Sequence, residues 1–146
     1  LRSRKSFSGC RTRCSVSIVM SEREKIQSSG SPKAIGPYSQ GIKANGFVFT
    51  SGILPLDVES GEVVPGGIEA ETRKTIENLK AVLEEGGASL ETVVKTTVFM
   101  TNMGDFAEMN RVYDEYFGKA LPARATVQVG ALAKGAQVEI EAVALV

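Results

Sequence analysis

Two segments with helical periodicity flank a segment with the composition of a β-strand, and this order restricts the folds that the chain can adopt. In residues 68–87, IEAETRKTIENLKAVLEEGG, apolar side chains recur at spacings of three and four, which predicts a helix with one buried face. Residues 106–117, FAEMNRVYDEYF, show the same spacing. Between them, residues 92–101, TVVKTTVFMT, are rich in β-branched side chains and predict a buried strand.

Turn-forming residues place a pair of strands before these elements and another pair after them. Asn45-Gly46 interrupts YSQGIKANGFVFTSG, and this dipeptide is typical of a tight hairpin. The chain closes with strands at 124–129 and 137–145, joined by GALAKGA. The predicted order is ββαβαββ, a two-layer α+β domain in which two helices cover one face of a mostly antiparallel sheet.

The uncovered face of this sheet is expected to meet another copy of the chain. Along 137–145, Glu139 and Glu141 point away from the helices, but the same face ends in Val143 and Leu145. Apolar side chains beside charged ones indicate a surface that pairs with other chains. The sequence therefore predicts a homo-oligomer.

The sequence contains no histidine, and its cysteines, Cys10 and Cys14, both lie near the N-terminus. This inventory excludes a disulfide framework in the core and any Ser-His-Asp or Cys-His catalytic pair. The usual zinc, copper and haem sites lack their ligands. A magnesium or calcium site made of carboxylates alone stays open, but no EF-hand or similar spacing is present. We expect neither a metal nor a cofactor.

Charge is distributed unevenly along the chain. The formal net charge is zero, but residues 1–20 carry basic side chains and no acid, so the remainder is net acidic. An acidic domain is poorly suited to binding nucleic acid, whose affinity depends on neutralising phosphates. No apolar run approaches the roughly 20 residues of a membrane-spanning helix. We expect neither nucleic acid nor a membrane as a partner.

Residues 1–30 read as a basic leader and linker, rich in Ser and Arg, ahead of a domain at 31–146. The composition of residues 1–20 is typical of an organelle transit peptide, which would direct the protein to a chloroplast or mitochondrion. The alternative is an untranslated or vector-derived leader with Met20 as the true start, and a cytoplasmic protein.

Arg124, just after Pro122, opens a strand and is the first candidate for chemistry. Its planar guanidinium can bind a carboxylate or a phosphate through two parallel hydrogen bonds, although an arginine at a strand end often pairs with a surface acid instead. Glu139 and Glu141 are either solvated or, if partly buried, raised in pKa and able to orient a water.

Weaker candidates lie in the N-terminal half of the domain. Ser51 and Gly52 form a bend in which backbone N–H groups can reach a ligand, although Ser-Gly is also a common turn. Tyr38, in IGPYSQ, is more often a core or interface aromatic than a catalytic phenol. Nucleotide-binding glycine motifs are absent.

Taken together, six blocks of sequence resemble the RidA family, also called the YjgF family. They are IGPYSQG (35–41), FTSG followed by Pro55, NLKAVLEEGGASLETVVKTTVFM (78–100), DFAEMNRVYDEYF (105–117), PARATVQV (122–129) and VEIEAVA (138–144). The resemblance implies a chorismate-mutase-like fold and a homotrimer with sites in the clefts between subunits. It also implies hydrolytic deamination of 2-aminoacrylate and related enamines, through 2-imino acids, to 2-keto acids and ammonia, without a metal or cofactor.

The resemblance also implies roles for individual residues. Arg124 would grip the substrate carboxylate, and Glu139 would position or activate the attacking water. The same cleft would be lined by Tyr38, Ser51, Gly52 and Thr126. Thr126 stands where many relatives have cysteine, so that position supplies no obligatory nucleophile. Ile53 departs from the commoner glutamine and would lose a polar contact, with consequences for which imines are accepted.

Two other functions stay open at this point. The trimer could bind 2-keto acids, or regulate a partner enzyme, without catalysing any reaction. RNA cleavage, with which some relatives are credited, is disfavoured by the acidic domain and the missing histidine.

Overall fold

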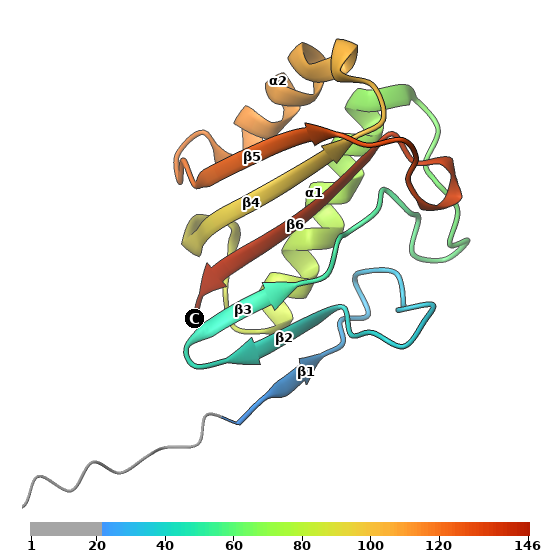
Figure 1. The fold of residues 1–146 in the computed structure, drawn as a ribbon. Coiled ribbons are helices and arrows are strands. Elements are labelled where there is room, and N and C mark those ends of the chain that lie inside the picture. Colours follow the sequence, from blue (N-terminus) through green and yellow to red (C-terminus); the bar gives the residue numbers. More distant parts are fainter. Residues whose placement is uncertain (1–21) are drawn as a thin grey trace, which may run out of the picture.

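A computed structural model describes residues 22–146 as one six-stranded sheet with two helices on one side (Figure 1). The strands are β1 (Glu24–Ile26), β2 (Gly41–Ala44), β3 (Phe47–Thr50), β4 (Val93–Met100), β5 (Ala123–Gln128) and β6 (Val138–Leu145). The helices are α1 (Gly67–Glu85) and α2 (Phe106–Phe117), with short 3-10 turns at Leu90–Thr92, Met103–Asp105 and Ala133–Gly135. The predicted leader at residues 1–20 lies outside the described residues.

The two-layer α+β prediction is confirmed, but the sheet has one strand more than expected. Strand β1 lies in the segment read as a linker, where it pairs antiparallel with β2. Only one of its side chains, Ile26, is buried, so the segment carries no alternating pattern that sequence analysis could detect. The folded part of the chain therefore begins before residue 31.

The strand order is β1-β2-β3-β6-β4-β5, in which the last strand of the chain lies in the middle of the sheet. Only β4 and β5 run parallel, as expected of a mostly antiparallel sheet. The predicted hairpin joins β2 and β3, and Asn45 and Gly46 both take the positive φ that its tight turn requires (50° and 79°). Strand β5 is left as an edge.

The core lies between the helices and one face of the sheet. Side chains of α1 pack there against Val138, Ile140 and Ala142 of β6. Glu71 of α1, which is also buried, accepts hydrogen bonds from the backbone N and Nε2 of Gln137, at 2.7 and 2.8 Å. This contact fixes the start of β6, two residues before Glu139.

The opposite face of the sheet is uncovered and partly apolar, as the sequence predicts. Phe49 and Leu145 are each 45% exposed, and Val127 is 42% exposed. Register places these side chains on the same face as Glu139 and Glu141. None of the helices in the described residues is long and apolar enough to cross a membrane.

Candidate functional site

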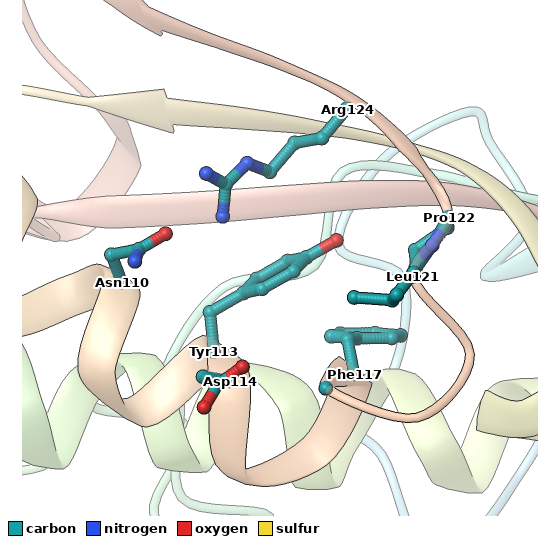
Figure 2. A pocket seen from close by; sticks show the side chains of 8 residues that line it. Asn110, Tyr113, Asp114, Phe117, Leu121, Pro122 and Arg124 are labelled. Atoms are coloured by element: carbon teal, nitrogen blue, oxygen red, sulfur yellow. The ribbon is translucent and has the colours of Figure 1, made fainter.

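Arg124 projects from edge strand β5 toward helix α2, so it lies on the helix-covered side of the sheet. Figure 2 shows its guanidinium over the ring of Tyr113. The Cζ atom is 4.6 Å from the ring centroid of Tyr113 and 5.6 Å from that of Phe106. The backbone turns sharply just before it, because Leu121 has a positive φ of 45° and is followed by Pro122. These features hold the arginine at the rim of a hollow.

No acid neutralises Arg124 within residues 22–146. Arg73 and Arg111 both form ion pairs with Glu115, whereas Arg124 forms none among the described residues. The hollow beside it has a volume of about 340 Å³ and is lined by Asn110, Tyr113, Asp114, Phe117, Gly118, Leu121, Pro122 and Arg124. Within the described residues, the N–H groups of Arg124 are therefore free to bind an external anion. No surface acid in this part of the chain forms the alternative ion pair with Arg124.

Thr126 lies two residues further along β5, on the same side as Arg124. Its Oγ1 is buried and has no hydrogen-bond partner in the described residues. A buried hydroxyl without a partner is costly, and most such groups in native proteins bind a protein atom or an ordered water. Arg124 and Thr126 thus lie on the same face of β5 and are called the Arg124 cluster.

Glu139 lies on the other face of the sheet, against the bend at Gly52. A Cβ built on Gly52 would sit 1.7 Å from Oε1 of Glu139, so the carboxylate rests directly over the glycine. The bend is held by paired backbone hydrogen bonds between Ile53 and Ile140, at 2.9 and 3.1 Å. Burial, and to a lesser degree the nearby Glu141, raise the pKa of Glu139 above its ordinary value.

Tyr38 and Ser51 line a small hollow beside Gly52, with a volume of about 40 Å³. The Ser51 hydroxyl donates to the carbonyl oxygen of Ser39 at 2.6 Å, which ties the bend to the segment that carries Tyr38. Tyr38 itself is 51% exposed and therefore available to a ligand or a second chain. Ile53 is buried in the core, so its side chain points away from Glu139.

The predicted residues thus fall into two clusters that do not meet within one chain. Tyr38, Ser51, Gly52 and Glu139 lie together, whereas Arg124 and Thr126 lie on the opposite face of the sheet. The register explains this separation, because Arg124 aligns with inward-facing Thr96, whereas Glu139 aligns with outward-facing Phe99.

The sequence analysis did not identify Tyr113 as part of a site, because its helical spacing fits a core stripe. Its hydroxyl is the signal that could have drawn attention, since a buried phenol needs a polar partner. In the structure that partner is Thr96, at 2.7 Å.

Comparison with known proteins identifies the family. The family described as Endoribonuclease L-PSP matches residues 28–146. A RutC family protein of Pyrococcus abyssi is 52% identical over 84% of this chain and 96% of its own length. The mouse 2-iminobutanoate/2-iminopropanoate deaminase is 44% identical over 84% and 91% of the two chains. Reactive Intermediate Deaminase A, chloroplastic, of Arabidopsis thaliana is 42% identical over 89% and 70%.

Solved structures give the same result. The Rid family protein YyfA of Yersinia pestis superposes with a TM-score of 0.82 at 44% identity, covering 86% of this chain and 100% of its own. Escherichia coli TdcF with bound serine gives 0.80 at 39% identity, covering 84% and 98%. The fold and the sequence together define a YjgF-type α+β domain. The chain belongs to the YjgF/RidA family.

Proposed function

We propose that this protein hydrolyses 2-imino acids, such as 2-iminopropanoate formed by tautomerisation of 2-aminoacrylate, to 2-keto acids and ammonia. Membership of the family and the name of the mouse relative support this activity. The observation that carries it is Arg124, a guanidinium without an acid partner in the described residues. The bound serine of TdcF is consistent with a ligand that carries a carboxylate.

The proposed reaction needs only binding and proton transfer. Arg124 binds the substrate carboxylate through two parallel hydrogen bonds and so fixes the position of the C=N carbon. Glu139, in its ionised form, accepts a proton from a water that adds to this carbon. Glu139 passes this proton to the imine nitrogen, which gives a neutral carbinolamine. The glutamate then takes the proton of the carbinolamine hydroxyl and delivers it to the amine, so that the C–N bond breaks, ammonia leaves and the C=O bond of the keto acid forms.

The separation of the two clusters supports a site shared between chains. In one chain, the Arg124 cluster and the Glu139 cluster face opposite sides of the sheet and could not contact one small substrate. We therefore propose a homotrimer in which each site takes Arg124 and Thr126 from one chain and Glu139, Tyr38, Ser51 and Gly52 from a neighbour. The exposed apolar side chains of the open sheet face, including Phe49 and Leu145, would be covered in this assembly.

The direct test is release of ammonia from 2-aminoacrylate generated in the assay by a pyridoxal-phosphate-dependent dehydratase. We expect the full chain to accelerate release over the spontaneous rate in buffer. If 2-oxobutanoate binds but the rate is unchanged, the protein is a non-catalytic keto-acid binder. If RNA is cleaved and imines are not hydrolysed, the family's ribonuclease description applies instead.

Gly52→Ala tests whether Glu139 must lie over the bend. The added Cβ would overlap Oε1 of Glu139 and force the carboxylate away. Because displacement of about 1 Å can cost ~10²-fold in rate, we expect kcat to fall by about 10²-fold. Gly130→Ala is the matched control, since its Cβ would meet nothing within 4 Å. Equal kcat values for Gly52→Ala and Gly130→Ala would remove Glu139 from this role.

The compartment follows from the leader. We propose a chloroplast or mitochondrial location if residues 1–20 act as a transit peptide, and a cytoplasmic one otherwise. The name of the Arabidopsis relative supports the plastid. A fusion of residues 1–30 to a fluorescent protein tests this, and diffuse cytosolic fluorescence would count against targeting.

A further inference from the structure

Tyr113 is a residue of helix α2 whose ring is held by a hydrogen bond at its hydroxyl and by a second aromatic ring beside it. Its hydroxyl shares a 2.7 Å hydrogen bond with Oγ1 of Thr96 on β4, and the residue is only 7% exposed. One side of its ring packs against Phe117, with centroids 4.5 Å apart. Burial raises the pKa of the Tyr113 hydroxyl, so the phenol stays neutral at physiological pH. The ring is therefore a rigid, uncharged surface.

This surface lies beneath the guanidinium of Arg124 (Figure 2). At 4.6 Å, the Tyr113 centroid is closer to Cζ than that of Phe106, which is 5.6 Å away. The ring face attracts the cation and leaves the edge of the guanidinium, with its N–H groups, open to a ligand. No ion pair within residues 22–146 competes to orient the arginine.

Thr96, which binds the hydroxyl of Tyr113, lies beside Arg124 in the sheet. Thr96 and Arg124 are direct partners in the register of β4 and β5. The hydrogen bond between Thr96 and Tyr113 therefore fixes the ring at the level of the sheet from which Arg124 extends. A phenylalanine facing a valine would fill the same space, so the buried hydroxyl pair orients the ring in a way that packing alone does not require.

We propose that Tyr113 is a positioning residue, anchored by Thr96, which holds the guanidinium of Arg124 in the orientation that binds a carboxylate. The identity of the ligand rests on the proposed function, whereas the restraint on Arg124 does not. An arginine held in advance loses less side-chain freedom on binding, so the restraint increases affinity without touching the ligand.

The first test measures the motion of Arg124 without any ligand, through the NMR order parameter of its Nε–H bond in the full chain. We expect a high value in the wild type and a clear decrease in Tyr113→Leu. Tyr116→Leu is the matched control, because Tyr116 lies on α2 like Tyr113 but stacks with a different arginine. The Cζ atom of Arg73, on α1, is 5.8 Å from the centroid of the Tyr116 ring. That variant should leave the order parameter of Arg124 unchanged. An Arg124 order parameter that is the same in Tyr113→Leu and the wild type would overturn the proposal.

Thr96→Val keeps the proposal testable if Tyr113→Leu does not fold, because valine matches threonine in shape. We expect Thr96→Val and Tyr113→Phe to give equal, intermediate decreases in the order parameter. Their combination should add little, since each removes the same hydrogen bond. Unchanged mobility in both single variants would exclude the anchoring role.

Affinity for 2-oxobutanoate gives the functional readout. We expect Tyr113→Leu to weaken binding by about three- to thirty-fold, the range of a cation–π contact, with Tyr113→Phe between it and the wild type. In turnover the loss should fall mainly on KM. If the wild type hydrolyses no imine, the proposed function fails, whereas the order parameters still decide the role of Tyr113.

Discussion

In Arg124→Ala, acceleration of ammonia release from 2-aminoacrylate should nearly disappear, with kcat/KM lower by about 10²–10⁴-fold. Two charge-assisted hydrogen bonds to a carboxylate contribute roughly 1.5–3 kcal/mol each, and about 1.4 kcal/mol corresponds to a factor of ten. Among residues 22–146, no other cationic side chain lines the hollow beside Arg124. Initial rates across a range of substrate generation, together with 2-oxobutanoate affinity, measure the loss.

Two further variants show whether the loss in Arg124→Ala comes from the planar shape of the guanidinium, from its charge or from altered folding. Arg124→Lys keeps the charge but not the planar fork, so it should recover only part of the activity. Arg73→Ala removes another arginine stacked on a tyrosine, one that does not line the hollow, and should leave kcat/KM unchanged. Light scattering must show the same assembly for every variant. An Arg124→Ala protein of unchanged assembly and full activity would remove the arginine from the mechanism.

The elements that sequence analysis located have either a long periodic pattern or a clear turn signal, such as the Asn45-Gly46 dipeptide between the short strands β2 and β3. Both helices and strand β4 have enough turns or alternating residues for their buried faces to be recognised. Strand β1 has three residues and one buried side chain, so its existence depends on pairing with β2 rather than on its own sequence. The central position of β6 likewise depends on contacts between segments far apart in the chain.

In the candidate site, too, some features follow from a local sequence pattern and others depend on contacts between distant segments. Alternation along a single strand is enough to place Arg124 and Thr126 on the same face. Whether Arg124 and Glu139 share a face depends on how β5 and β6 each align with β4, which no local pattern encodes. Sequence analysis could not predict that Tyr113 lies close to Arg124, because the helical spacing of Tyr113 fits an ordinary core position.

Replacement of Glu139 by glutamine should lower kcat by about 10²–10⁴-fold, the usual contribution of a general base. The pKa of Glu139 is raised, so the pH at which the base becomes ionised lies above that of an ordinary glutamate. In the wild type, kcat/KM should therefore rise with pH through this pKa, and this rise should be missing in Glu139→Gln. Glu141→Gln removes a neighbouring charge that raises the pKa, so it should move the rise to lower pH.

Stability should change with pH in the opposite direction to activity. A carboxyl group with a raised pKa holds its proton more tightly in the folded chain than in the unfolded one. The folded state is therefore favoured most at low pH and loses this advantage as pH rises from the unfolded pKa through the folded one. Denaturation by urea should show Glu139→Gln gaining stability relative to the wild type across that interval. A difference independent of pH would contradict the raised pKa.

Mixing the two inactive variants tests whether a site is shared between chains. A chain with Arg124→Ala still carries Glu139, and a chain with Glu139→Gln still carries Arg124. In a cyclic trimer that contains both variants, one of the three interfaces pairs an intact Arg124 with an intact Glu139. After unfolding and refolding in equal amounts, roughly three-quarters of the trimers are mixed, and each holds one complete site among three. About a quarter of the wild-type activity should return. If both residues acted within one chain, the mixture would stay as inactive as its components, and refolding each variant separately supplies that baseline.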